Sequence, residues 1–514
     1  MQWWAADHLK LSFWRPLTEL TQWLDYRLWP DTPVMLHLHS ICWYGLLVYL
    51  LGRLYRMLDD DPVRTGLATL IFAVSSLHLF IVAWLAARNQ LMSACFAVTT
   101  VMAYHQWRSR RRMLHGALAM STLTLGLLCA EAAIATVGYL AAYALAYEQD
   151  TPWPRRLLAL LPFLAIVVAW RVGYTYMGYG SIGSGAYIDP GASLPRFGLA
   201  LLMRLPTLLL ALLFGASAAV FNELPQHIKL LYAFGAGATV LLCIGVGRYF
   251  GLWASRQARF FALGALFALV PVCAAEPSDR LLLNAEIGLS AVFAVLFTRF
   301  TATRRQHTGT VSWGAKAVVV LMMLVHLVVF PLMSTGTALF MHRVARLTAH
   351  DEPLSLPDAR PHMILLNPPA PMLLYYFPAI RSYFGVRNPA SIQALAEGIQ
   401  DLTLTVLDGH TIRLSGTRGF GDAMSRDFKT LPFKPGDTVH AGAFDVTIDD
   451  VTPEGMASSV RFRFAMPLND PSLGFYAWAD DGGYVPLELP AVGQRMAIAK
   501  VDLGKMVRRA LKGG

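Results

Sequence analysis

The sequence predicts a polytopic α-helical membrane protein of about eleven helices with a C-terminal, mostly β soluble domain. Hydrophobic residues make up 55% of the 514 residues, while charged residues make up only 15%. A soluble globular domain typically carries about 25% charged residues, so most of this chain is too apolar for water. After about residue 340 the composition changes, because Asp, Pro and Gly become frequent and short alternating segments replace the long apolar runs.

Eleven apolar runs approach the ~20 residues that an α-helix needs to cross a bilayer. Together they predict a transmembrane domain over residues 34–338, preceded by an extracytoplasmic segment, 1–33. The runs lie at 34–52, 66–86, 90–106, 114–130, 131–148, 157–173, 198–221, 228–248, 258–275, 283–299 and 314–335.

Arginine-rich loops predict the orientation of these helices. "WRSRRRM" at 107–113 and "TRRQH" at 303–307 are typical of cytoplasmic loops, whereas the Gly-rich stretch 174–195 is typical of an outside loop. Four runs separate this outside loop from 303–307, although an odd number is required, so either 198–221 or 228–248 is expected not to span. Much of the net charge of +10 lies in such loops, so we expect no nucleic-acid partner.

Residues 339–514 are predicted to form an extracytoplasmic, mostly β domain. "LTLTVLDGHTIRLSG" at 402–416 is typical of a hairpin that turns at Asp408 and Gly409. "HMILLNPPAPMLLYYFPAI" predicts a strand, a Pro-rich turn and a short helix, and three further stretches predict an antiparallel sandwich or barrel: "HAGAFDVTIDDV", "SSVRFRFAM" and "GFYAWADDGGYVPLEL".

The cysteines predict neither disulfides nor zinc binding. All five lie in or beside apolar segments without metal-ligand spacing, so we expect buried free thiols. They are Cys42, Cys95, Cys129, Cys243 and Cys273.

Arg88 is the only charged residue between Gly66 and Gln106. A guanidinium at mid-bilayer costs about 3 kcal/mol on insertion scales, so such a residue usually faces a cavity, a partner or the membrane boundary. The predicted orientation places Arg88 at the outer boundary. There it either binds an anionic lipid head group or acts as an anchor that snorkels to water.

Three segments carry a resemblance to a known family. "SSLHLFIVAWLAARNQLMSACF" at 75–96, "SFWRPLTELTQWLDYRLW" at 12–29 and "GLLCAEAAI" at 126–134 resemble motifs of the transmembrane and tetratricopeptide-repeat O-mannosyltransferases and their bacterial relatives, in the GT-C class of glycosyltransferases. The matching positions are Arg15, Pro16, Leu17, His37, His78, Val82, Trp84, Arg88 and Glu131.

The chain also departs from the family pattern. Phe80, Gln90 and Ala130 stand where the family has Glu, Asp and Lys, and Ser75 and Ser76 replace a His-Pro pair. Tetratricopeptide repeats are absent. The family's acidic pair, which is associated with catalysis and a divalent cation, lies well upstream of the Arg-Pro-Leu segment. Only 14 residues precede Arg15 here, so we expect either an upstream start or loss of that site.

The resemblance implies transfer of a sugar from a polyprenyl-phosphate donor to a hydroxyl of an envelope glycan, a lipid or a protein. A carboxylate would accept the hydroxyl proton, and cations would stabilise the leaving phosphate. No cofactor is certain, although a divalent cation would suit the family. The candidate acids are Asp7, Asp25, Asp189 and Glu131, the candidate phosphate contacts are Arg15, Arg88 and Arg280, and His78 is either a packed histidine or a ligand.

Each candidate acid also has a non-catalytic interpretation. It is either a solvated loop acid or a helix cap, or, for Glu131, a structural acid within the membrane. Two other functions also stay open. A transporter is expected to show internal repeats and broken helices, and no repeat is evident. A catalytically inactive membrane module that binds glycans or partners through its β domain fits the missing acids. The resemblance implies a bacterial inner-membrane location. The predicted cytoplasmic loop at 300–313 and the run at 314–335 place the C-terminal domain outside.

Overall fold

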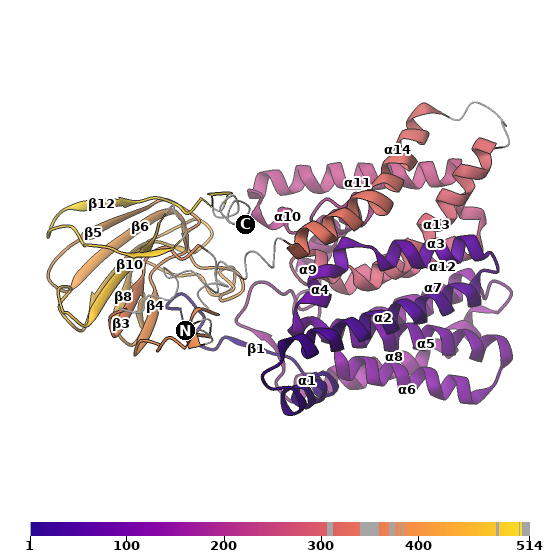
Figure 1. Cartoon of the computed structure of the whole chain (residues 1–514), viewed down its shortest axis with the longest axis horizontal. Helices are drawn as coiled ribbons and strands as arrows, with labels where there is room; N and C mark the ends of the chain where they lie inside the picture. The colour runs from indigo at the N-terminus through magenta and orange to yellow at the C-terminus, as the bar shows by residue number, and fades with distance from the viewer. Residues whose placement is uncertain are drawn as a thin grey trace. The chain divides into compact units, whose positions relative to one another are not determined.

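A computed structural model gives the fold (Figure 1). It describes residues 2–305, 312–339, 359–369, 376–379, 381–382, 385–479, 483–502 and 504–505. The chain divides into a helical unit, residues 12–180 and 187–336, and a β unit, residues 1–11, 181–186 and 337–514. Part of the predicted cytoplasmic marker 303–307 and part of the predicted helix after Pro369 lie outside the described residues.

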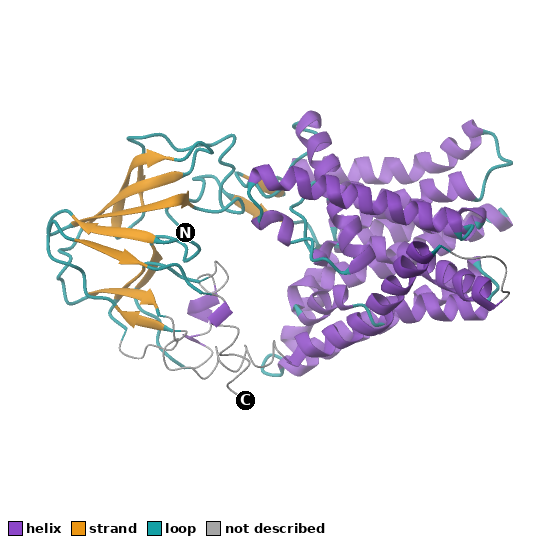
Figure 2. Cartoon of the chain, turned by 90° about the horizontal axis from the view of Figure 1, so that it is seen from above, coloured by secondary structure: helices purple, strands orange, loops and turns teal. Residues whose placement is uncertain are grey.

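In the helical unit the predicted apolar runs form helices, shown in purple in Figure 2. Its α-helices are α1 (Pro16–Leu28), α2 (Pro33–Leu58), α3 (Pro62–Ala73), α4 (Leu79–Ala83), α5 (Arg88–Arg110), α6 (Met113–Cys129), α7 (Ala135–Ala146), α8 (Trp153–Tyr176), α9 (Leu194–Phe214), α10 (Val220–Glu223), α11 (Gln226–Tyr249), α12 (Arg256–Val272), α13 (Leu283–Arg305) and α14 (Trp313–Leu324). Single turns of 3₁₀-helix, η1 (Ser76–His78), η2 (Leu85–Ala87), η3 (Glu131–Ile134), η4 (Leu252–Ala254) and η5 (Asp279–Leu281), and one π-helical turn, η6 (Val325–Val329), link or extend them.

Six helices in the described residues are long and apolar enough to cross a membrane. The run predicted at 66–86 forms a pair of helical segments bent by 43° instead, and the runs at 114–130 and 131–148 form shorter apolar helices. The protein is therefore mostly helical with six candidate spans, or seven if the bent pair counts as one. The six are Pro33–Leu58, Trp153–Tyr176, Leu194–Phe214, His227–Tyr249, Leu283–Thr303 and Trp313–Leu339.

Helix α13 lies at the centre of the helical unit, since 78% of an apolar stretch of 18 residues within it is buried. Gly288 allows its close contact with the neighbouring helices. A Cβ atom there would lie 2.2 Å from the backbone oxygen of Phe261 and 2.9 Å from the Tyr139 hydroxyl. A side chain at this position would therefore push α12 and α7 away from α13.

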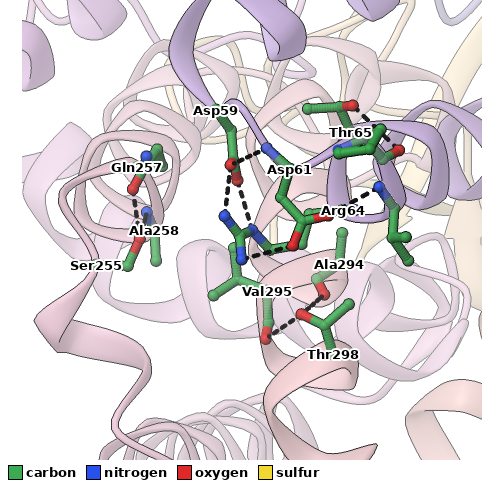
Figure 3. A network of polar contacts seen from close by, with 12 residues as sticks. Asp59, Asp61, Arg64, Thr65, Ser255, Gln257, Ala258, Ala294, Val295 and Thr298 are labelled. Atoms are coloured by element: carbon green, nitrogen blue, oxygen red, sulfur yellow. Dashed lines mark hydrogen bonds and ion pairs between the residues drawn. The ribbon is translucent and has the colours of Figure 1, made fainter. Parts of the chain in front are cut away.

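The turn between α2 and α3 is held by a local clasp of charges (Figure 3). Asp61 caps α3 by accepting hydrogen bonds from the backbone N–H groups of Val63 (2.8 Å) and Arg64 (3.2 Å). The Arg64 guanidinium then donates to both carboxylate oxygens of Asp59, at 2.7 and 2.6 Å. The Arg64 side chain stays 34% exposed, so this clasp lies at the surface of the unit.

The β unit contains two sheets that enclose one apolar core. The larger sheet has the order β12-β5-β6-β9-β8-β7 and is antiparallel throughout, and β5 and β6 pair across the turn at Asp408 and Gly409 as predicted. The smaller sheet has the order β11-β10-β3-β4, and its β3 pairs in parallel with both neighbours, so the prediction of a purely antiparallel arrangement is wrong for this sheet. A two-stranded sheet joins β1 to β2.

The strands are short, as expected for alternating segments between Gly- and Pro-containing turns. Their bounds are β1 (Lys10–Ser12), β2 (Gly180–Ile182), β3 (His362–Leu365), β4 (Ser391–Ala394), β5 (Leu402–Val406), β6 (Thr411–Phe420), β7 (Thr438–His440), β8 (Phe444–Val451), β9 (Ala457–Phe464), β10 (Leu473–Trp478), β11 (Tyr484–Pro486) and β12 (Arg495–Ile498).

The first residues of the chain complete the β core. Trp3 and Trp4 are 2% and 1% exposed, and the Trp3 indole N–H donates to the backbone oxygen of Leu395 (2.9 Å). The segment predicted as one loop, residues 1–33, thus divides at Leu11 between the two units.

The five cysteines are free thiols in the helical unit. Cys95, Cys129 and Cys273 are buried as predicted, whereas Cys42 is exposed and Cys243 is intermediate. The prediction of burial is wrong for Cys42, because an apolar run does not reveal which face of its helix packs against other helices.

Candidate functional site

Helix α1 brings the three family-like segments together. This helix of 13 residues packs on α6, where the Thr18 hydroxyl donates to the backbone oxygen of Cys129 (3.0 Å), and on α5, where the Thr21 hydroxyl lies 3.7 Å from the Met92 sulfur. Pro16 starts the helix with a preset φ angle. Residues 12–29, 75–96 and 126–134 therefore meet in one place.

Arg15 and Glu131 form an ion pair at this place. The Arg15 Nε and Nη2 atoms donate to Glu131 Oε2 at 3.0 and 2.7 Å, and the Tyr174 hydroxyl donates to Oε1 at 3.3 Å. Glu131 opens the 3₁₀ turn that separates α6 from α7. Both side chains remain more than a quarter exposed, so the carboxylate is neutralised by arginine and still accessible.

Arg88 lies in a buried cluster that fixes α1 against α2 and α5. Its Nη1 atom pairs with Asp25 of α1, Nε donates to the Ser40 hydroxyl (3.1 Å), and Nη2 donates to the backbone oxygen of Leu36 (2.7 Å). The His39 Nδ1 atom lies 2.7 Å from the other oxygen of Asp25. The Arg88 and Asp25 side chains are 1% and 3% exposed, so this guanidinium is shielded and engaged inside the protein.

Arg280 differs from the other two candidate phosphate contacts. Its guanidinium carbon lies 5.5 Å from the centre of the Trp84 ring, which is the arrangement of a cation–π contact. Within the described residues its guanidinium has no hydrogen bond or ion pair, and its neighbour Asp279 accepts hydrogen bonds from the Ser217 hydroxyl and from the backbone N–H of Ala218 (2.6 and 2.7 Å). Arg280 therefore keeps its donors available for an anion.

The other predicted residues lie elsewhere. Asp7 belongs to the β unit and is exposed. Asp189 is half-exposed, pairs with Arg171 at 2.7 Å and caps its own turn through the backbone of Gly191 (2.9 Å). His78 is buried inside the helical unit, where its Nε2 atom lies 3.0 Å from a carboxylate oxygen of Glu286. The structure thus brings Arg15, Asp25, Arg88 and Glu131 around α1, without Asp7 and Asp189.

The sequence did not single out Glu286 and Tyr174, which contact the predicted residues His78 and Glu131. Glu286 is the only charged residue between Leu281 and Thr298, the same signal that singled out Arg88. Tyr174 carries no such signal, because a tyrosine near a helix end is ordinary in membrane proteins. No group of three or more His, Cys, Asp or Glu side chains that could hold a metal ion occurs in the described part of the chain.

Comparisons with protein-family models, with curated proteins and with solved structures found no match for this chain.

Proposed function

We propose that the protein is an integral membrane glycosyltransferase of GT-C-like architecture, with about eleven membrane segments, a bacterial inner-membrane location and an extracytoplasmic β domain. It would move a sugar from a polyprenyl-phosphate donor to an envelope glycan, a lipid or a protein. The observation that carries the proposal is the meeting of the family-like segments around α1. Arg15 pairs with Glu131 across 116 positions and Asp25 pairs with Arg88 across 63.

Glu131 is the proposed general base. In the reaction the acceptor oxygen forms a bond to the anomeric carbon, the bond from that carbon to the phosphate oxygen breaks, and the hydroxyl proton passes to the carboxylate. In the structure described here the Arg15 guanidinium neutralises this carboxylate. We propose that Arg15 exchanges Glu131 for the donor phosphate, which frees the base only when the donor is bound.

Arg280 is the proposed second phosphate contact. A guanidinium matches the geometry of phosphate oxygens, and its planar face can remain on the Trp84 ring while its edge binds an anion. The charge that develops on the leaving polyprenyl phosphate would be stabilised there. Arg88 takes a different role in this proposal, because its contacts position α1 and therefore Arg15.

The full-length protein in liposomes, supplied with a panel of polyprenyl-phosphate sugars, tests the function. We expect one donor to release free polyprenyl phosphate in the presence of a hydroxyl acceptor. Arg280→Ala should lower that release about tenfold or more, since a hydrogen bond to a charged group contributes about 1.5 to 3 kcal/mol. Arg64→Ala is the matched control, because it removes an arginine of the surface clasp. Absence of release with every donor, or equal release by the Arg280 variant, would contradict the proposal.

One observation favours the alternative, a catalytically inactive module that binds glycans or partners. The three predicted acids of the helical unit are all paired, Asp25 with Arg88, Glu131 with Arg15 and Asp189 with Arg171. The β unit also has a cavity of about 240 Å³, whose lining includes Trp478 and Lys500. Under this alternative, immobilised glycans would retain the protein through Trp478, and no donor would be consumed.

A further inference from the structure

The turn that joins α5 to α6 carries three consecutive arginines, Arg110, Arg111 and Arg112. Their side chains are exposed, and within the described residues none of the three guanidinium groups has a hydrogen bond or an ion pair. The two helices pack against each other and α6 also contacts α8, so the turn lies at one end of this group of helices (Figure 1). That end of the helical unit therefore carries positive charge that the fold itself does not neutralise.

Two nearby arginines differ, because the fold uses their charges. Arg108 of α5 pairs with Glu148, and Arg156 of α8 donates to three backbone oxygens at distances of 2.6 to 3.2 Å. These contacts hold the loop between α7 and α8 next to the end of α5. Asp150 of that loop is exposed, and the exposed Arg155 that follows it balances its charge. The three arginines of the turn thus remain an excess of positive charge.

The backbone at Arg111 indicates that its side chain has a role outside the turn. Arg111 ends α5 in the left-handed conformation, with φ 53° and ψ 23°, and it is the only residue other than glycine with a positive φ in the described part of the chain. Glycine is usual after the end of a helix, because a Cβ atom is unfavourable in this conformation. The backbone therefore favours glycine here, and a contact of the arginine side chain outside the chain explains the exception.

Apolar side chains are exposed beside the arginines. Met113 and Leu114, the first residues of α6, are 73% and 77% exposed, and Trp153, the first residue of α8, is 55% exposed. Water disfavours such side chains, whereas the boundary between the headgroups and the acyl chains of a bilayer accommodates them, and tryptophan is enriched there. Basic side chains beside apolar ones match the two parts of a phospholipid whose headgroup is negatively charged.

We propose that the α5–α6 turn is a binding site for anionic phospholipid. Arg110, Arg111 and Arg112 bind the phosphate oxygens of the headgroup, and Met113 and Leu114 contact the acyl chains. The predicted orientation places this site in the cytoplasmic leaflet. A zwitterionic phospholipid offers the same phosphate, but the cation of its headgroup repels the arginines, so the site selects lipids with net negative charge. The inference rests on the proposed membrane location and not on sugar transfer.

Native mass spectrometry of the full-length protein in detergent, titrated with phosphatidylglycerol or with phosphatidylcholine, tests the site without a sugar donor. We expect the wild type to bind phosphatidylglycerol more tightly. Changing all three arginines of the turn to glutamine should weaken the tightest phosphatidylglycerol site about a hundredfold, because one basic residue near an anionic lipid surface contributes a factor of about five. Phosphatidylcholine binding should change little.

A matched variant separates the local charge from the net charge. Arg418→Gln, Arg463→Gln and Arg495→Gln together remove three exposed arginines from the β unit, so this variant has the same net charge as the triple variant of the turn. It should bind phosphatidylglycerol as the wild type does. An equal loss in both triple variants would overturn the proposal, because the effect would then come from net charge alone.

Arg111→Gly separates lipid binding from folding. Glycine removes one positive charge and suits the left-handed backbone, so thermal unfolding should show a variant at least as stable as the wild type. Its phosphatidylglycerol affinity should nevertheless fall about fivefold. Wild-type affinity in Arg111→Gly and in the triple variant of the turn would overturn the proposal, as would equal binding of the two lipids by the wild type.

Discussion

Two arginine–aspartate pairs of opposite character lie next to the two ends of α2. At its start, Arg88 and Asp25 come from positions 63 residues apart and are almost completely buried. At its end, Arg64 and Asp59 are five residues apart, and Arg64 is one-third exposed (Figure 3). The first pair joins separate helices, and the second closes a turn that Asp61 already caps. Burial and sequence separation, rather than the residue types, therefore distinguish a contact that joins helices from one that closes a local turn.

The largest effect is expected from Arg88→Ala. Removing one partner of a buried ion pair leaves the other charge uncompensated, so the variant should lose about 3 to 5 kcal/mol of unfolding free energy. Denaturant titration of the purified protein measures the loss. The double variant Arg88→Ala with Asp25→Ala should recover part of it. If the double variant loses the sum of the two single losses, Arg88 and Asp25 do not interact as described.

The β unit contains a buried acid that has no cationic partner among the described residues. Glu397 of the β unit is 9% exposed, and burial, together with the neighbouring Asp422, raises its pKa to about 8. The folded protein therefore binds a proton that the unfolded chain has lost above about pH 4.5, the ordinary value. Stability of the β unit should fall as pH rises from about 4.5 to about 8, by up to about 1.4 kcal/mol per pH unit.

Glu397→Gln should flatten that pH dependence, because the amide does not titrate. Thermal unfolding of the full chain, followed through the β-sheet circular dichroism signal at several pH values, compares the two proteins. A wild-type β unit that is equally stable across this range would contradict the assignment of a buried, protonated Glu397.

The smallest effect is expected from Arg64→Ala. Exposed ion pairs contribute about 0 to 1 kcal/mol, and the Asp61 cap of α3 remains in this variant. The same denaturant titration should therefore detect a loss several times smaller than that of Arg88→Ala. A loss as large as that of Arg88→Ala would remove the distinction between the two ends of α2.

Periodicity and composition predicted much of the architecture. The apolar runs lie on helices, and the alternating segments after 400 form strands. Bends within the runs were not predictable, because the break at residues 74–75 depends on packing and not on a proline or glycine. The position of Trp3 in the β core was also hidden, since it depends on a contact with Leu395, 392 residues away.

The sequence showed which charged residues are unusual, but it did not show which residues they contact. An arginine inside an apolar run predicted that Arg88 has a special environment, and Arg88 is buried with a charged partner. The sequence could not identify Asp25 as that partner, because the pairing requires α1 to pack across α2 and α5. The phosphate contact predicted for Arg88 stays a prediction, and the observed contacts favour Arg15 and Arg280 for that role.

Single-turnover sugar transfer by Glu131→Gln, with the folded fraction of each sample determined in parallel, tests whether Glu131 is the general base. Glu131 is more than a quarter exposed, so the amide should leave the unfolding free energy within about 1 kcal/mol of the wild type. Loss of a general base should nevertheless slow transfer about a hundredfold or more. A wild-type rate of transfer by Glu131→Gln per folded molecule would show that Glu131 is not the general base.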